Sequence, residues 1–208
     1  AAEIISDRKV DSRDFFGAVG GEWTELRREL FGAALEHEPL LAFLDPTWTI
    51  ADLGCGTGAS AAEMALWVNG IEAVDREEAM LEAAKIRLAG HGNISFHQSD
   101  LKAIPLPDAS VDAALISLVM HHIESPLEVL REALRIVRPG GPVLIIDMVE
   151  HQRDAYRDTM GHVHLGFSEE DLRGWANASG GQLSTFQRLR SDSGSTGPAL
   201  FVARLHAH

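Results

Sequence analysis

The stretch Ile50-Ala51-Asp52-Leu53-Gly54-Cys55-Gly56-Thr57-Gly58 decides how the rest of the chain is interpreted. A short apolar run ends at an acidic residue, and three glycines follow at alternate positions. The alanine-rich segment 59–68 comes next and is typical of a helix. Glycines let a backbone turn sharply and approach a ligand closely, and a helix N-terminus presents free N–H groups. We therefore predict a strand, a glycine loop and a helix that cradle a nucleotide-like ligand.

Length and composition restrict the class of protein. The chain has 208 residues, of which 45% are hydrophobic, enough for one α/β domain with a substantial core. It contains no apolar run of membrane-spanning length, and its first residues lack a basic stretch followed by an apolar one, so we expect an unexported protein. The single cysteine fits a reducing cytoplasm. The net charge of −13 argues against a nucleic-acid backbone as the partner. We expect a cytoplasmic protein that acts on a small molecule without a membrane partner.

Residues 1–45 differ from the rest and predict a helical cap, with the main domain at 46–208. Apolar residues recur there at spacings of three and four, as in amphipathic helices. Gly20-Gly21 is expected to divide this stretch into two helices, and a third short helix is expected around 39–44. Most of these residues are expected to cover one edge of the domain. A sharper alternative makes Phe15, Phe16 and Trp23 a lid, with Phe16 and Trp23 as substrate contacts, and a homodimer contact is also left open.

From residue 49 onward the pattern changes to alternating strands and helices. A mostly parallel sheet with helices on both faces is the expected result. The expected strands are 49–53, 71–74, 94–97, 111–117 and 143–148, and the expected helices are 59–68, 77–88 and one that begins at Pro126.

Two helix starts carry capping signals, and the end of the chain carries a hairpin signal. Ser125, Pro126 and Glu128 match an N-cap, a first-turn proline and a capping box. Ser168 is expected to cap a helix over 169–178. The strand-like runs 182–190 and 199–205 follow without a helix between them, which favours an antiparallel hairpin at the sheet edge.

Three acidic residues help to identify the ligand. The glycine pattern also satisfies the dinucleotide fingerprint, so an NAD-dependent oxidoreductase is one alternative. Asp52 is placed to meet a cationic amine, Asp75 a ribose diol and Asp100 an adenine amine, with the Leu101 N–H nearby. Three acids around one crevice would repel a pyrophosphate. They suit S-adenosylmethionine, which carries a positive charge, a ribose and an adenine but no phosphate.

The chain resembles the class I S-adenosylmethionine-dependent methyltransferases, with motifs in the family's order from about residue 49 to 148. The motifs that carry this resemblance are Ala51-Asp52-Leu53-Gly54-Cys55-Gly56-Thr57-Gly58, Ala73-Val74-Asp75 with Met80-Leu81, Gln98-Ser99-Asp100-Leu101, Pro105-Leu106-Pro107-Asp108-Ala109-Ser110-Val111-Asp112, Leu118-Val119-Met120-His121-His122-Ile123 and Val137-Arg138-Pro139-Gly140-Gly141.

The resemblance implies an α/β, Rossmann-like, three-layer fold with a seven-stranded, mostly parallel sheet and an antiparallel last strand. It also implies that S-adenosylmethionine donates a methyl group to O, N or C of a small acceptor. The corresponding cofactor-binding positions are Asp52, Gly54, Cys55, Gly56, Thr57, Gly58, Asp75, Arg76, Met80, Ser99, Asp100, Leu101 and Ser117.

Flanking motifs resemble a narrower subgroup. Ser12-Arg13-Asp14-Phe15-Phe16, Glu22-Trp23 and Gly161-His162-Val163-His164-Leu165-Gly166-Phe167 are similar to methyltransferase domains that follow a winged-helix repressor domain of the arsenic-repressor (ArsR) type. This similarity leaves open a non-catalytic module that senses S-adenosylmethionine. Arsenic methylation is disfavoured because that chemistry uses several cysteines, and Cys55 is interpreted as a structural residue of the glycine loop.

Histidines are the candidates for the chemical step. His121 and His122 follow the fourth expected strand, where the family places groups near the transferred methyl. His162 belongs to a second polar cluster, and a histidine can deprotonate a hydroxyl near neutral pH. We predict these three as catalytic. The remaining members of the polar cluster are Asp147, Glu150, His151 and His164, of which His151 and His164 are predicted substrate contacts. A divalent metal is the alternative, but we assign no metal.

Overall fold

The computed structural model describes residues 11–191 and 194–207. The chain divides between Phe43 and Leu44 into two compact units. Everything that forms the candidate site belongs to the second unit. No helix among the described residues has the length and apolar character needed to cross a membrane.

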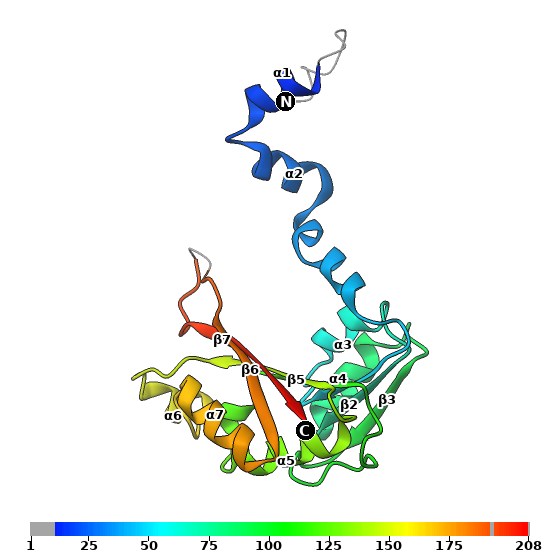
Figure 1. Ribbon diagram of the computed structural model, residues 1–208, viewed down its shortest axis with the longest axis vertical. Coiled ribbons are helices and arrows are strands. Elements are labelled where there is room, and N and C mark those ends of the chain that lie inside the picture. Colours follow the sequence, from blue (N-terminus) through cyan, green and yellow to red (C-terminus); the bar gives the residue numbers. More distant parts are fainter. Residues whose placement is uncertain (1–10, 192–193, 208) are drawn as a thin grey trace. The chain divides into compact units, whose positions relative to one another are not determined.

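A seven-stranded sheet forms the centre of the second unit (Figure 1). Its strand order is β3-β2-β1-β4-β5-β7-β6, with parallel pairing from β3 to β5 and β7 antiparallel to both of its neighbours. This arrangement confirms the predicted sheet, including its inserted antiparallel last strand. The strands are β1 (Thr49–Leu53), β2 (Gly70–Asp75), β3 (Ile94–Gln98), β4 (Ala113–Ser117), β5 (Pro142–Met148), β6 (Gly181–Arg188) and β7 (Leu200–Ala207).

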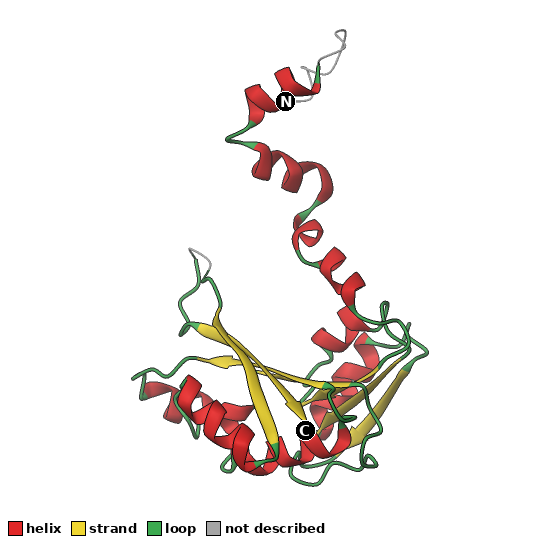
Figure 2. Ribbon diagram, in the orientation of Figure 1, coloured by secondary structure: helices red, strands yellow, loops and turns green. Residues whose placement is uncertain are grey.

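Helices cover both faces of this sheet (Figure 2). Side chains alternate along β1, so Ile50 packs with the core of one face and Ala51 with the core of the other. The first core includes α3 (Ala59–Met64) and α4 (Glu78–Arg87), and the second includes α5 (Pro126–Ile136) and α7 (Glu169–Ala178). The three-layer Rossmann-like class is therefore confirmed.

Some predicted helix signals and boundaries differ from the structure. Ser125 makes no side-chain capping bond; its carbonyl oxygen accepts the Glu128 N–H instead, so the predicted capping box is wrong, although Pro126 does begin α5. Helix α3 ends at Met64, four residues earlier than expected. Ser168 is the predicted cap of α7, and it forms a capping box with Asp171.

The predicted strand 111–117 begins at residue 113. The Asp112 carboxylate accepts the Thr49 N–H at 2.7 Å, and the Val111 backbone makes only an isolated bridge to Val137. The Val111 N–H donates to the Ile136 carbonyl at 3.1 Å and the Asp112 N–H to the Thr49 carbonyl at 2.8 Å, so both positions are hydrogen-bonded but lie outside the continuous ladder of β4.

The first unit contains the helices that the glycine pair was expected to separate. The glycine pair lies between α1 (Ser12–Val19) and α2 (Trp23–Phe31). The 3-10 helices η2 (Ala33–Glu36) and η3 (Glu38–Phe43) follow, and η3 lies near the third short helix expected around 39–44. The rings of Phe15 and Trp23 meet edge to face with centroids 6.1 Å apart. The Phe16 side chain lies outside the described residues, as does the part of the expected cap at 1–10. The cap, lid and substrate-contact roles stay predictions.

Candidate functional site

The glycine loop lies at the carboxyl ends of the parallel strands, where ligands bind in open α/β sheets. Gly54, Gly56 and Gly58 have φ angles of +77°, +53° and +74°. A Cβ on Gly54 would lie 2.4 Å from Cγ2 of Val119, and one on Gly58 would lie 2.7 Å from Cδ1 of Leu88. A Cβ on Gly56 would have no other atom within 4 Å. The outer glycines therefore permit packing, whereas Gly56 keeps the loop surface clear for a ligand.

Asp52 is a buried acid beneath this loop. Its side chain belongs to β1 and the residue is only 2% exposed, yet its Oδ2 has no hydrogen-bond partner among the described residues. Burial raises the pKa of Asp52 to about 7, and the charge of Asp75 adds to the effect. The backbone N–H of Ala61 donates to this carboxylate, but a buried oxygen without a partner is unfavourable unless a cation or donor satisfies it. These properties fit a positively charged ligand such as S-adenosylmethionine.

Asp75 fastens the glycine loop to the end of β2. Its Oδ2 accepts the Gly56 N–H at 2.8 Å, and its Oδ1 accepts the Glu77 N–H at 2.9 Å. Each carboxylate oxygen has two lone pairs, so both retain capacity for a ribose hydroxyl. Asp75 therefore shapes the loop as well as offering the acceptors that the sequence predicted.

The segment after β3 carries the predicted adenine contacts. Asp100 is exposed, and its Oδ1 accepts the Lys102 N–H at 2.9 Å. The Ser99 hydroxyl donates to the Ala103 carbonyl at 2.8 Å, so this hydroxyl is engaged within its own loop. Leu101 is buried and anchors the segment in the core.

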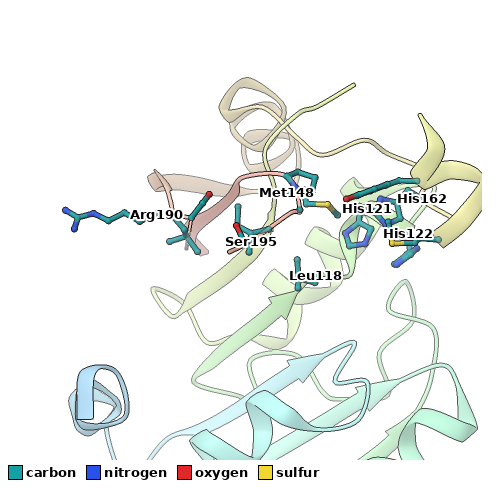
Figure 3. Close-up of a pocket in the computed structure, with 14 residues that line it drawn as sticks. Leu118, His121, His122, Met148, His162, Arg190 and Ser195 are labelled. Atoms are coloured by element: carbon teal, nitrogen blue, oxygen red, sulfur yellow. The ribbon is translucent and has the colours of Figure 1, made fainter. Parts of the chain in front are cut away.

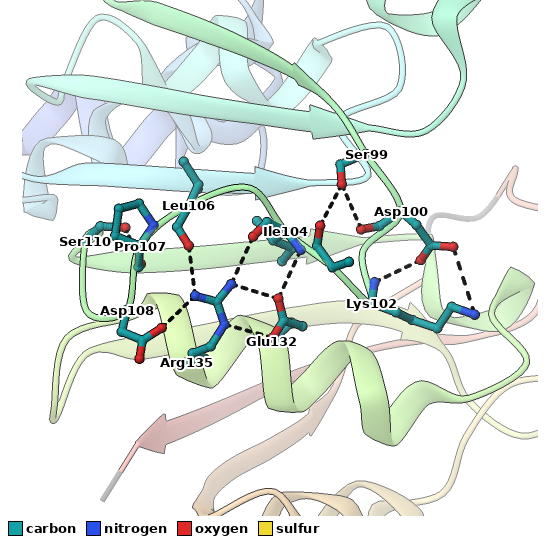
Figure 4. Close-up of polar contacts among 11 residues, drawn as sticks. Ser99, Asp100, Lys102, Ile104, Leu106, Pro107, Asp108, Ser110, Glu132 and Arg135 are labelled. Atoms are coloured by element: carbon teal, nitrogen blue, oxygen red, sulfur yellow. Dashed lines mark hydrogen bonds and ion pairs between the residues drawn. The ribbon is translucent and has the colours of Figure 1, made fainter.

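Two residues of α5 hold that segment in place, as Figure 4 shows. Arg135 donates to the carbonyl oxygens of Ile104 and Leu106 at 2.9 and 2.8 Å. Glu132 accepts the Ile104 N–H at 3.0 Å and pairs with Arg135 at 2.8 Å. Sequence reasoning missed both residues, because an acid and a base three positions apart on a helix usually form only a surface pair.

The remaining predicted cofactor residues lie near the same edge. Cys55 is buried, which raises the pKa of its thiol to about 12 and makes it unreactive, in keeping with the structural interpretation. Thr57 is exposed at the loop, and Ser117 is half-buried at the end of β4. Arg76 is exposed and pairs with Glu77, and Met80 in α4 is 45% exposed.

A strained turn connects the glycine loop to the histidines. Leu118 has a φ of +55°, which is uncommon for a residue with a side chain. The turn places Val119 against Gly54, as the close approach above shows. The 3-10 helix η4 (Met120–His122) begins at the next residue. The histidine segment is therefore adjacent in space to the glycine loop.

Figure 3 shows the three predicted catalytic histidines gathered at one end of the cavity. His121 and His162 are buried, and His122 is exposed. The Nδ1 atom of His121 lies 2.8 Å from Oδ1 of Asp147, which is completely buried at the end of β5. The ring centroid of His121 lies 4.2 Å from that of His122 and 4.3 Å from that of His162. The fold thus assembles the three predicted catalytic residues.

Several nitrogens of the histidine region are buried without a partner among the described residues. They are Nδ1 of His162, Nε2 of His151 and Nε2 of His164. Burial lowers the pKa of His162, and the neighbouring His121 and His122 add to this effect. Burial also lowers the pKa of His151, with a contribution from Arg153. Burial therefore disfavours the charged form of both His151 and His162.

A cavity of about 560 Å³ opens beside these rings. His121, His122 and His162 line it, whereas the predicted substrate contacts His151 and His164 are not among its lining residues. His151 instead packs edge to face with Tyr156, and His164 packs against Phe167. Sequence reasoning missed most of the lining, which comes from four separate segments: Leu118, Met148, Tyr156, Met160, Leu189, Arg190, Ser191, Ser195, Gly197, Pro198 and Leu200.

Comparison with known proteins finds a partial match to a described family of domains. Residues 51–145 match the family model described as a methyltransferase domain. A demethylmenaquinone methyltransferase from Clavibacter sepedonicus is 38% identical over 98 residues, which is 47% of this chain and 40% of that protein. The chain therefore spans less than half the length of this curated relative.

Solved structures share the fold. An S-adenosylmethionine-dependent methyltransferase from Aquifex aeolicus superposes with a TM-score of 0.66 at 22% identity, covering 88% of this chain and 93% of the other. One from Mesorhizobium loti has a TM-score of 0.66 at 22% identity, covering 81% and 96%. At this identity the solved structures show the fold alone, and the matched methyltransferase domain supports the predicted enzyme class and S-adenosylmethionine as its cofactor. These comparisons do not show the predicted resemblance to methyltransferase domains fused to ArsR-type repressors.

Proposed function

We propose that this protein transfers a methyl group from S-adenosylmethionine to a small acceptor with an apolar body and a weakly acidic hydroxyl. One observation carries the proposal: Val119 packs on Gly54 of the glycine loop, two residues before His121 at the wall of the cavity. A donor in the loop and an acceptor in the cavity would thus be neighbours, and proximity is the main requirement of an in-line transfer.

The cofactor contacts follow from the unsatisfied and open positions of the cradle. Asp52 offers a buried carboxylate to the positive charge, and Gly56 offers an open backbone surface. Asp75 offers acceptors for the ribose, and the Leu101 backbone with Asp100 offers an edge for the adenine. When bound, S-adenosylmethionine supplies a methyl group on a positively charged sulfur.

The acceptor class follows from the cavity lining. Leu118, Met148 and Met160 provide apolar surface, and the histidines provide polar atoms at one end. A phenol or hydroquinone fits both features. Its hydroxyl proton leaves to solvent, and the resulting electron-rich oxygen, or a ring carbon beside it, would form the new bond to the methyl carbon while the bond between that carbon and sulfur breaks and S-adenosylhomocysteine is released. Transfer to a ring carbon would also release the hydrogen of that carbon as a proton. The Clavibacter relative, named for demethylmenaquinone, favours this acceptor class.

Product formation tests the proposal. The full chain is incubated with S-adenosylmethionine and a series of small phenols and hydroquinones, and mass spectrometry follows S-adenosylhomocysteine together with methylated acceptor. We expect both products in equal amounts, only when an acceptor is present. Tight cofactor binding without product from any phenol, hydroquinone or cell extract would favour the sensing module instead, as the resemblance to repressor-fused domains suggests.

A further inference from the structure

The three histidines of the cavity wall have the arrangement of a metal-binding set. One ring nitrogen from each of His121, His122 and His162 lies within 4.8 Å of the other two. Zinc binds histidine nitrogens at about 2.0–2.1 Å, which puts the ligand atoms of a tetrahedral site roughly 3.4 Å apart. Side-chain shifts on the order of 1 Å would close the set. Sequence analysis kept a divalent metal as an alternative only for the polar cluster that contains His162; it did not combine His162 with His121 and His122, because the three ligands come from two distant segments.

Hydrogen bonds to the opposite ring nitrogens orient two of the rings. His121 Nδ1 pairs with the Asp147 carboxylate at 2.8 Å, and His122 Nδ1 lies 3.2 Å from the carbonyl oxygen of Gly161. A carbonyl only accepts, so Nδ1 of His122 carries its proton and Nε2 has a free lone pair. A carboxylate also only accepts, so a neutral His121 carries its proton on Nδ1 and has its free lone pair on Nε2. Partners of this kind are typical of metal-ligating histidines.

His162 supplies an independent observation. Its Nδ1 is buried and has no hydrogen-bond partner among the described residues, although buried imidazole nitrogens normally have one. His162 is 6% exposed and its ring lies beside those of His121 and His122. A metal ion bound between the three rings would satisfy this atom.

The buried carboxylate of Asp147 gives an electrostatic reason for a cation at this place. Asp147 is 0% exposed, and it accepts from the backbone N–H of Met148 at 2.7 Å as well as facing His121. Among the described salt bridges, its only partner is His121, which carries charge only when protonated. A divalent cation on the far side of the His121 ring would balance this carboxylate.

We propose that His121, His122 and His162 bind one divalent first-row transition-metal ion, with zinc as the best match to three imidazole ligands. Three protein ligands leave a fourth position open, as in catalytic rather than structural zinc sites. All three residues line the cavity, so that position faces the acceptor. The role in catalysis rests on the proposed function: the ion would bind the acceptor hydroxyl and lower the pH at which its proton is lost.

Metal binding is tested directly, without reference to turnover. The metal-free full chain is titrated with Zn²⁺ by calorimetry and with Co²⁺ by visible spectroscopy, which reports four-coordinate geometry. We expect one ion per chain. His122→Ala and His162→Ala are each expected to weaken binding at least about tenfold, since even the loss of a residue that only hydrogen-bonds to a metal ligand does so. His91→Ala, after α4 and outside the cluster, is the matched control and should bind as the parent does.

The outcomes separate the metal site from the proposed function. Absence of Zn²⁺ and Co²⁺ binding by the parent, or unchanged affinity in both ligand variants, would overturn the metal site even if methyl transfer occurs. Stoichiometric binding that is lost in both variants, with thermal unfolding and S-adenosylmethionine affinity retained, supports the site even if no acceptor is methylated. His121 is left unchanged in these experiments, because its removal would leave Asp147 buried without its ring partner.

Discussion

The Nδ1 atom of His121 lies 2.8 Å from Oδ1 of Asp147, with side chains that are 5% and 0% exposed. The pair joins η4 to the end of β5 within the wall of the cavity. It holds one tautomer and one orientation of the His121 ring.

Asp147→Asn tests Asp147 as a positioning residue. The amide preserves the shape but removes the negative charge behind His121. We expect Zn²⁺ affinity to fall by about 10–100-fold, which is typical for loss of an outer-shell carboxylate. Calorimetry measures the affinity, and thermal unfolding checks that the variant is folded. A folded variant with unchanged Zn²⁺ affinity would contradict this role.

Asp52 predicts a pH dependence of cofactor binding. Its pKa is raised to about 7 by burial, so it is largely protonated at pH 6 and largely ionised at pH 8. The ionised form attracts a cationic ligand, so S-adenosylmethionine affinity should rise as the pH rises through 7, with release of a proton. Calorimetry in buffers of different ionisation enthalpy measures this release. Asp52→Asn should bind more weakly and without the pH dependence; an equal slope in both proteins would refute the assignment.

The same group predicts a pH dependence of stability. Between pH 4 and 7 the unfolded Asp52 has lost its proton, whereas the folded one still holds it. The folded state therefore binds more protons than the unfolded state. As a result, the contribution of Asp52 to the free energy of unfolding falls as the pH rises through this window. Denaturant titrations measure the free energy of unfolding of the parent and of Asp52→Asn, and the difference between the two values should change with pH over this range. A constant difference would show that the pKa of Asp52 is not raised.

Gly56→Ala isolates the ligand surface of the glycine loop. Gly56 and Gly180 both have positive φ, at +53° and +81°, and neither has an atom within 4 Å of its would-be Cβ. Both substitutions should therefore strain the backbone by a similar amount, on the order of 1–2 kcal/mol. Only Gly56→Ala should weaken S-adenosylmethionine binding markedly. Equal affinities in the two variants would place the ligand elsewhere.

Arg135→Met tests the support of the loop after β3. The change removes donors from the Ile104 and Leu106 carbonyls, and we expect a loss of roughly 1–3 kcal/mol in the free energy of unfolding. Arg173→Met in α7 is the control, because its exposed pair with Glu169 is expected to contribute less than about 1 kcal/mol. Denaturant titrations compare the two. An equal, small effect would make Arg135 an ordinary surface residue.

The elements that sequence reasoning predicted are those set by local patterns. The run through β4 reads as a buried strand because both faces are covered, and Ser168 caps α7 through its immediate neighbours. The signal at Ser125 failed because its carbonyl, rather than its hydroxyl, accepts the Glu128 N–H. Local spacing indicates a cap but does not decide which oxygen is used.

Sequence reasoning could predict those parts of the candidate site whose positions follow from the order of the strands along the chain. The glycine loop and the three acids follow strand ends, so the topology brings them to one edge. The cavity lining depends on how the β6–β7 loop packs near α6 (Ala155–Met160), which no short pattern encodes. His151 and His164 were predicted from their residue type alone, and the structure places other residues in the lining.

Calorimetric titration of the full chain with S-adenosylmethionine at pH 8, beside Asp75→Ala, tests the central claim most directly. The account predicts one site per chain in the parent and a large loss of affinity in the variant, with circular dichroism showing that the variant stays folded. Absence of binding by the parent, or full affinity in Asp75→Ala, would contradict it.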